Sequence, residues 1–437
     1  MDALSLAILF LILALAVALL LARWPVAAPL GLYACLLPFD AVLDIGQAGS
    51  LHIHLTWAIA ATVAGILLVR GLLGGSFVRP PYVVLWPSLI VFWGVISALW
   101  AINTERAVFR VPVIAVFLVL YLAAACVPVS EKELEVMGWL AMLGGCVAAA
   151  TSLYELFHGI SYASSHPNLG MEYVHELSGR GTLVVGDRQT NPNDFAATLI
   201  LPLSLALGLL PSARTWVRYF FLMGVGAVIA AGIYKTGSRG GLLGTMVVLL
   251  VYLWRSRANR RLMMPLAAVG VILLVAPQMF FSRFSSAVAD RGSGRLDIWQ
   301  VGLWAIGHYT FIGAGLDCFP DVYNRYAYAA AHFAGYNRAS HNMYLGMAVE
   351  LGVVGILLLL GTLIGHYLLT ANGHRADPDE SSRLRLTSYE GAFWGLLMCG
   401  FFSDLFWEEY FWFALMLLIM GVRVRELHQN NSLPAII

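Results

Sequence analysis

The chain has 437 residues, of which 60% are hydrophobic and 12% are charged, and its mean hydropathy is +0.78. Soluble proteins carry about 25% charged residues, so this composition excludes an ordinary soluble globular protein and indicates a polytopic membrane protein. The formal net charge of +1 argues against nucleic acid as a partner. The basic residues are almost all arginines, because Lys132 and Lys235 are the only lysines.

Long apolar segments recur along the whole chain. A membrane-spanning helix needs about 20 largely apolar residues. Candidate segments fall near 3–22, 26–43, 55–69, 82–101, 107–127, 136–157, 194–210, 216–233, 240–254, 262–281, 342–370, 389–405 and 409–424. The first lacks a positive n-region and a cleavage site, so we expect a retained span. We predict an all-α polytopic membrane protein that forms a single integral domain over residues 1–437. It would have about 12 spans, or 13 if none of the segments is re-entrant.

The distribution of Lys and Arg predicts the orientation of these spans, because short cytoplasmic loops are enriched in both residues. The densest basic loop covers residues 255–261, and alternation places most other basic loops on the same side. Those loops contain Arg70, Arg79, Lys132, Arg214, Arg218, Arg375, Arg383, Arg385, Arg423 and Arg425. The N-terminus would lie outside with 13 spans and inside with 12.

Two long connections, 158–193 and 282–341, would then face outward. They are too polar to span a membrane, so we expect them to be functional periplasmic loops. Residues 296–306 and 320–333 in the second loop could form helices at the membrane surface.

The outer face would carry more cations than the positive-inside bias allows. They are Arg106, Arg180, Arg188, Lys235, Arg239, Arg283, Arg291, Arg295, Arg325 and Arg338. Long loops follow the positive-inside bias only in part, so their cations need no further explanation. A short loop such as 234–240 should follow the bias, and its two cations are therefore unexpected on this face. The planar guanidinium of arginine binds phosphate bidentately. The sequence therefore predicts a pyrophosphate at this face, such as that of a polyprenyl-diphosphate sugar carrier in a bacterial inner membrane.

Three motifs lie on the predicted outer face. Residues 187–194 (DRQTNPND) precede a span, and the NPN turn would start a helix with Asn193 or Asp194 as the N-cap. In residues 291–295 (RGSGR) glycines separate two arginines. The third motif is residues 340–344 (SHNMY), which open a long apolar helix.

His341 lies in the third of these motifs. The helix dipole and the nearby arginines would keep its imidazole neutral, which is the form a general base needs. Glu350 lies about two turns deeper in the same predicted helix.

Together these motifs resemble those of the O-antigen ligase and O-antigen polymerase superfamily. The resemblance rests on residues 340–344, on Glu350-Leu351-Gly352 and Gly355, and on four further motifs in order and spacing. The four are the NPN segment, Ser238-Arg239-Gly240, Gly294-Arg295-Leu296 with Trp299, and Gly313 with Gly315. The motifs cover residues 180–370, and they separate ligases from polymerases poorly.

This resemblance implies a metal-independent GT-C-like glycosyltransferase without a cofactor. It would transfer O-antigen from undecaprenyl diphosphate to lipid A–core at the periplasmic side of the inner membrane. His341 would be the general base, and Arg188 and Arg295 would bind the diphosphate. Further diphosphate or sugar contacts would come from Arg239, Lys235, Arg291, Asn191, Asn193, Asn342 and Tyr344. Asp187, Asp194, Asp297 and Asp317 could orient His341 or contact the acceptor.

Other functions remain open at this point. An O-antigen polymerase shares the donor but extends another lipid-linked chain, and other polyprenyl-diphosphate oligosaccharide ligases differ in their acceptor. A secondary transporter for an anionic substrate is a third alternative. Such transporters tend to have inverted repeats and charges at mid-membrane, whereas this sequence shows no repeat and its charges cluster at one face.

Overall fold

The computed structural model describes residues 15–48, 51–75, 77–160, 180–185, 188–255, 294–376 and 380–432. Within them the α-helices are α2 (Ala27–Leu36), α3 (Leu55–Gly74), α4 (Leu85–Ser97), α5 (Thr104–Cys126), α6 (Glu131–Phe157), α9 (Pro192–Thr198), α10 (Ile200–Leu209), α11 (Trp216–Thr236), α12 (Arg239–Arg255), α15 (Arg295–Ile306), α16 (Phe319–Tyr326), α17 (Met343–Ala376), α18 (Glu380–Cys399) and α19 (Glu409–Ser432). Short 3-10 helices are η1 (Leu37–Val42), η2 (Tyr82–Val84), η3 (Ala327–Ala329) and η4 (Leu405–Trp407).

Two antiparallel hairpins, which the sequence did not predict, join the helices. One pairs β1 (Asp44–Ala48) with β2 (Leu51–His54), and Asp44 lies opposite His54. The other pairs β3 (Val184–Val185) with β4 (Arg188–Gln189). The expected all-α fold is therefore correct for the bulk of the described chain but not for these two connections.

Six of the described helical segments are long and apolar enough to cross a membrane. They are Leu55–Gly74, Thr104–Cys126, Glu131–Phe157, Pro192–Leu209, Trp216–Thr236 and Met343–Arg375. Ala27–Val42 and Tyr82–Ser97 are shorter apolar helices. These segments confirm a polytopic membrane protein. The predicted segments at 240–254, 389–405 and 409–424 correspond to α12, α18 and α19, which are helical but outside the six.

The total number of spans stays a prediction, because two of the expected segments lie wholly or largely outside the described residues. Segment 262–281 is wholly outside them, and only residues 15–22 of segment 3–22 are described.

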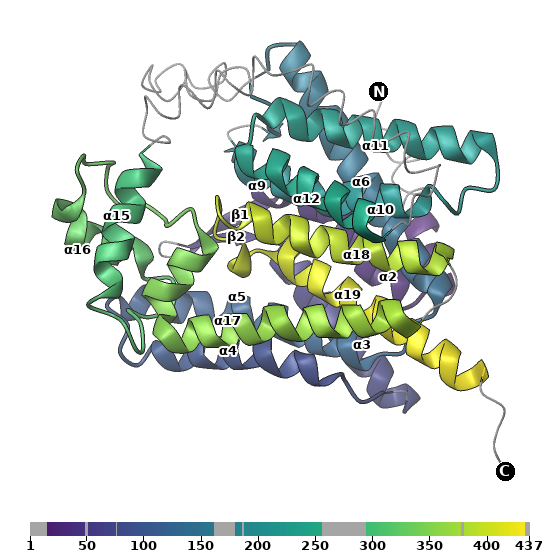
Figure 1. Cartoon of the computed structure of the whole chain (residues 1–437), viewed down its shortest axis with the longest axis horizontal. Coiled ribbons are helices and arrows are strands. Elements are labelled where there is room, and N and C mark those ends of the chain that lie inside the picture. Colours follow the sequence, from purple (N-terminus) through teal and green to yellow (C-terminus); the bar gives the residue numbers. More distant parts are fainter. Residues whose placement is uncertain are drawn as a thin grey trace.

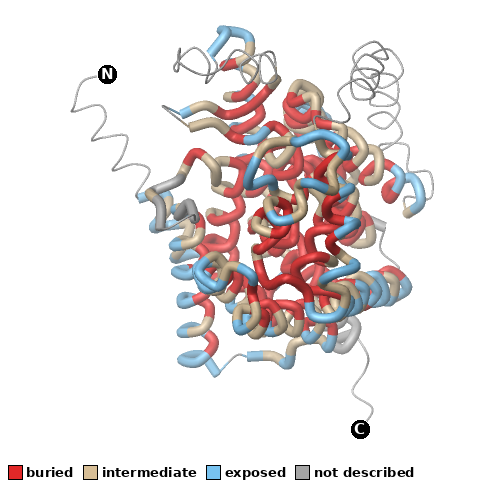
Figure 2. Tube along the Cα trace, turned by 90° about the vertical axis from the view of Figure 1, so that its left-hand side faces the viewer, coloured by how far each residue is buried: buried red, intermediate tan, exposed pale blue. Residues whose placement is uncertain are grey.

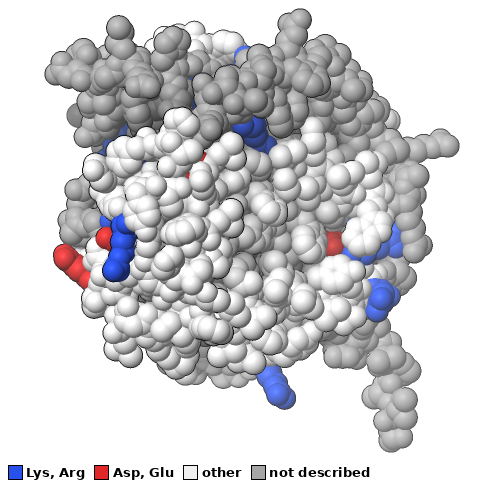
Figure 3. Space-filling view, turned by 60° about the vertical axis from the view of Figure 1, so that its left-hand side comes forward, with Lys and Arg blue, Asp and Glu red and all other residues white. Residues whose placement is uncertain are grey.

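The long helices run side by side, and α10 and α19 occupy the interior (Figure 1). α10 is buried along its whole length, and α12 and α10 both pack on α18. Viewed from one end, the buried residues gather in the middle of the bundle (Figure 2). Large apolar side chains such as Leu73, Phe220 and Leu357 are exposed on the outer helices, and the surface drawn in Figure 3 carries few charges. An apolar exterior is what lipid contact requires.

Arginine contacts gather at one end of this bundle. Arg423 donates from Nη2 to the Arg79 carbonyl oxygen at 2.5 Å, and Arg218 pairs with Glu135 at 2.7 Å. Arg385 pairs with Glu131. These contacts bring together the loops that charge alternation groups on one side. Which side of the membrane this end faces is still a prediction.

The opposite end carries α15 and α16, which attach where α17 is interrupted. Gly352 has φ +66° inside α17, so the expected continuous helix over 342–370 is wrong at this residue. The Val353 amide donates to the Thr310 carbonyl and the Gly315 amide to the Glu350 carbonyl, at 2.8 and 2.9 Å. The segment 310–315 therefore crosses the backbone of α17 closely, which only glycines at the crossing permit.

The two expected surface helices are present in part. The first, expected over 296–306, is α15. The second, expected over 320–333, is shorter, because α16 ends at Tyr326 and the chain turns back after η3. Asn337 donates its amide to Asn324 Oδ1 at 2.7 Å and fixes this return.

Candidate active site

His341 lies in the connection before α17 and adopts φ +47°, a strained conformation for a residue other than glycine. Its backbone N–H donates to Asp404 Oδ2 at 3.0 Å, and the Ser340 hydroxyl donates to the other carboxylate oxygen of Asp404. The Met343 amide donates to the Gly400 carbonyl oxygen at 2.8 Å. The connection between α18 and α19 therefore holds His341 in place.

Neighbouring residues of the motif fix the start of α17. Asn342 Oδ1 accepts the amides of Tyr344 and Leu345, both at 3.0 Å, and so caps the helix. The Tyr344 hydroxyl donates to the Leu397 carbonyl oxygen at 2.9 Å. Trp299 Nε1 donates to the Ser340 carbonyl oxygen at 3.0 Å and ties α15 to the motif. Asn342 and Tyr344 thus have structural partners, and their contact with substrate stays a prediction.

Charged groups surround the His341 ring. Burial lowers its pKa most, Arg295 and Arg338 lower it further, and Asp404 and Asp194 act in the opposite direction. The net effect is a lowered pKa. The neutral imidazole expected from the sequence agrees with this direction, but the main cause is burial and not the helix dipole.

The NPN segment forms the first turn of α9. Asn191 is its N-cap, since Asn191 Oδ1 accepts the Asn193 amide at 2.8 Å. The expected cap at Asn193 or Asp194 is therefore wrong by two or three residues, because Pro192 occupies the first helical position. Asn193 Oδ1 accepts Arg180 Nη2 at 3.3 Å. Asp194 accepts a hydrogen bond from the Ser403 hydroxyl, next to Asp404.

The short loop 234–240 is a tight link between two helices. Gly237 ends α11 with φ +62°, and Ser238 Oγ accepts the Gly241 amide at 3.2 Å to cap α12. Lys235 lies in the last turn of α11, and Arg239 is the first residue of α12. Arg180 Nε donates to the Thr236 carbonyl oxygen at 2.8 Å and joins this link to α9.

The structure therefore brings Arg295 near His341, whereas the other predicted cations lie on other elements. Arg188 lies on β4 and pairs with Val185, and Lys235 and Arg239 lie where α11 and α12 meet. Arg291 and Asp187 lie outside the described residues.

Asp404 was not predicted as a site residue from the sequence, and Arg180 and Arg338 were predicted only as members of the outward-facing group of cations. The sequence contains one signal that could have pointed to Asp404, because this residue belongs to a short acidic patch between two apolar segments.

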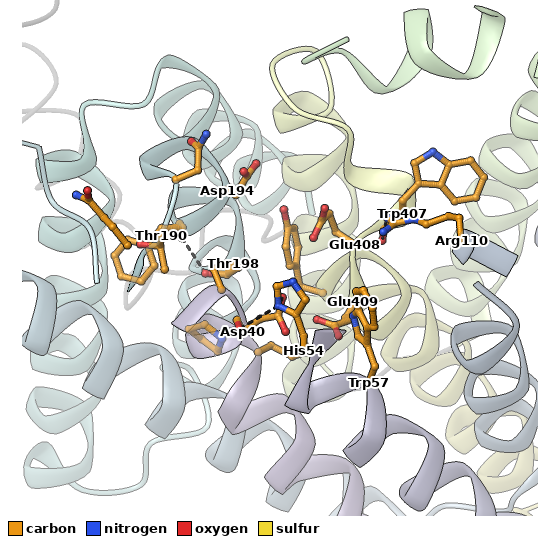
Figure 4. Close-up of a pocket in the computed structure, with 17 residues that line it drawn as sticks. Asp40, His54, Trp57, Arg110, Thr190, Asp194, Thr198, Trp407, Glu408 and Glu409 are labelled. Atoms are coloured by element: carbon orange, nitrogen blue, oxygen red, sulfur yellow. Dashed lines mark hydrogen bonds and ion pairs between the residues drawn. The ribbon is translucent and has the colours of Figure 1, made fainter. Parts of the chain in front are cut away.

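A cavity of about 330 Å³ lies beside Asp194, which also accepts the hydrogen bond from Ser403. Its lining comes from η1, β2, α3, α5, β4, α9, η4 and α19. Figure 4 shows Asp40, His54 and Glu409 close together, with Trp407 and Arg110 to one side and Asp194 to the other. His54 Nδ1 pairs with Asp40 Oδ2 at 2.9 Å. Burial lowers the pKa of His54, but this pairing outweighs it and the net pKa is raised.

Fold and site together define an integral membrane protein with a histidine–carboxylate–arginine cluster at one end of its helices. Residues 220–360 match the model of the Wzy_C family, which is described as O-antigen ligase. The matched stretch contains Lys235, Arg239, Arg295 and His341. The family covers O-antigen ligases and polymerases, and its substrates are in general lipid-linked glycans. Among curated proteins, no relative matches the chain.

Proposed function

We propose that the chain is a glycosyltransferase that moves a glycan from undecaprenyl diphosphate to lipid A–core at the periplasmic face of a bacterial inner membrane. The observation that carries this proposal is His341, held by Asp404, near Arg295 and inside the stretch that matches the Wzy_C family. The proposed orientation puts the His341 end of the bundle outside, with 12 or 13 spans in total.

His341 would act as the general base. Its lowered pKa keeps the imidazole free to accept a proton from the acceptor hydroxyl. The oxygen of that hydroxyl would attack the anomeric carbon of the donor sugar with inversion, and undecaprenyl diphosphate would leave with the bonding electron pair. Arg295 and Arg188, with Arg239, Lys235 and Arg291, would stabilise the charge on the departing diphosphate. Asn191, Asn193, Asn342 and Tyr344 are the proposed polar contacts to substrate.

A transfer assay tests this proposal. The purified protein in detergent would receive lipid-linked donor and lipid A–core, and glycan attached to the core would be measured. We expect transfer by the wild type and none above background by His341→Ala. Tyr252→Phe, which removes a hydroxyl in α12 that donates to the Ser204 carbonyl oxygen, serves as a control for general damage. Full activity of His341→Ala would remove that residue from the chemistry.

An O-antigen polymerase is the alternative, because the Wzy_C family includes both activities. The same assay distinguishes them by product. A glycan extended on the carrier lipid indicates a polymerase, whereas a glycan on lipid A–core indicates a ligase.

A further inference from the structure

The cavity beside Asp194 contains polar groups without a protein partner. The Tyr410 hydroxyl makes no hydrogen bond with any described residue, although Tyr410 is only 4% exposed. Arg110 Nε is likewise buried and unpartnered among them. The Glu408 carboxyl group also lines the cavity. A buried polar atom without a partner costs free energy, so these groups point to a ligand that supplies the missing hydrogen bonds.

The rest of the polar wall is already paired. Thr56 Oγ1 donates to Glu409 Oε1 at 2.7 Å and also contacts Asp40 Oδ1. Asp40 in turn pairs with His54, and the His54 ring lies 4.9 Å from that of Trp57. This network joins η1, β2, α3 and α19, so it holds the wall of the cavity in one shape.

The lining of the cavity does not suit the diphosphate of the donor. Its single arginine, Arg110, already donates from Nη2 to the Trp407 carbonyl oxygen at 3.1 Å, and His54 is already paired with Asp40. Tight binding of a diphosphate calls for several cationic donors that are free to contact it, and this lining does not supply them. In the part of the chain that the structure describes, no group of three or more His, Cys, Asp or Glu side chains could hold a metal ion. The ligand is therefore neither a diphosphate nor a chelated metal ion.

Sugar hydroxyls fit this lining, because each one both donates and accepts hydrogen bonds. The protonated Glu408 carboxyl offers a donor and an acceptor, Tyr410 and Arg110 offer donors, and the indoles of Trp57 and Trp407 offer apolar surface. The volume of about 330 Å³ lies at the small end of the usual range for ligand sites, about 300–1,000 Å³. We propose that this cavity binds an uncharged sugar ring of the acceptor glycan.

The acceptor is favoured over the donor because of Asp194. Asp194 lines the cavity and also acts electrostatically on His341, the proposed base. Asp194 therefore belongs both to the lining of the cavity and to the charged surroundings of the group that would deprotonate the acceptor hydroxyl. All its lining residues lie outside the matched stretch 220–360. This inference rests on the proposed transfer reaction.

Steady-state kinetics with purified donor and lipid A–core would test it. Tyr410→Phe removes one oxygen atom that has no described protein partner, so folding should be unaffected. We expect the acceptor KM to rise by about three- to tenfold, the effect of one neutral hydrogen bond, with the donor KM unchanged. Trp57→Ala should raise the acceptor KM further, and if it does not fold, Tyr410→Phe decides alone.

The matched control is Tyr252→Phe, which removes a tyrosine hydroxyl that does not line the cavity and that does have a partner. It should lower thermal stability and leave both KM values unchanged. An unchanged acceptor KM in Tyr410→Phe, or a rise in the donor KM instead, overturns the inference while the wild-type transfer still supports the proposed function. A wild type that transfers no glycan overturns both.

Discussion

At the scale of single residues, the site depends on carboxylates that reach His341 from other elements. Asp404 accepts the His341 N–H and so holds a strained backbone conformation in place. Asp194 contacts Ser403, the residue before Asp404, and it also lines the cavity. Asp194 therefore belongs both to the surroundings of the proposed base and to the proposed sugar site.

Asp404→Asn is expected to lower kcat by about 100-fold, because a misplaced base loses its alignment with the acceptor hydroxyl. The Asp404 charge raises the pKa of His341, so its removal lowers that pKa further. The acid limb of the pH–rate profile should then move to lower pH. A profile that stays in place while thermal stability falls would assign Asp404 a purely structural role.

Glu408 should make acceptor binding sensitive to alkaline pH. Burial raises the pKa of its carboxyl group to about 8, and Asp194 and Asp40 add to this rise while Arg110 and His54 oppose it. Below that pH the protonated carboxyl both donates and accepts, and above it the carboxylate only accepts. The acceptor KM of the wild type should therefore rise as the pH passes 8. In Glu408→Gln it should stay flat, because the amide keeps both functions, and a parallel rise in both proteins would exclude Glu408 as the cause.

At the scale of elements, glycines let the outer segment cross α17. Gly352 and Gly313 both have positive φ, +66° and +79°. A Cβ at Gly352 would collide with the Phe311 carbonyl oxygen, and one at Gly313 with the Glu350 carbonyl oxygen. The Glu350-Leu351-Gly352 motif thus has a structural role, since it positions α15 and, through Trp299, the His341 connection.

Gly352→Ala should destabilise the protein by at least about 1–3 kcal/mol, the cost of a residue held in a disfavoured backbone conformation. The matched control is Gly224→Ala in α11, where no atom lies within 4 Å of the added Cβ. Thermal unfolding in detergent would measure both. Equal melting temperatures for the two variants would contradict the close crossing.

At the scale of the whole molecule, apolar stretches predicted the helices and alternating charge predicted which loops meet. Two further structural features, the break in α17 and the cavity, could not be predicted from the sequence for physical reasons. The break at Gly352 lies in a long, largely apolar run that also contains Gly346 and Gly355, so the glycine by itself does not signal an interruption. The residues that form the cavity are scattered between positions 37 and 410 of the chain. No local sequence pattern predicts that residues so far apart in the chain come together. The short motifs located the His341 region, but the partners of His341 come from tertiary contacts.

Cysteine labelling would test the orientation. Ala331 and Arg214 are both exposed, the first near α16 and the second before α11. In a variant without the native cysteines, Ala331→Cys should react with an impermeant thiol reagent once the outer membrane is permeabilised. Arg214→Cys should react only after the inner membrane is broken. The reverse labelling pattern would show the opposite orientation in the membrane and would place the proposed site on the cytoplasmic side.

The positions of the cavity-lining residues along the chain have an evolutionary consequence. The proposed base and Arg295 belong to the stretch 220–360, whereas the cavity is built from the β1–β2 hairpin region and the η4–α19 junction, with further residues on α5, β4 and α9. The two parts lie on different stretches of the chain, although Asp404, which holds His341, lies directly before η4. A lineage that keeps Asp404 could acquire a new acceptor through changes in the hairpin and in the cavity-lining residues of the junction while it inherits the transfer chemistry. Chimeras that exchange those segments but keep Asp404 would carry the acceptor preference with them.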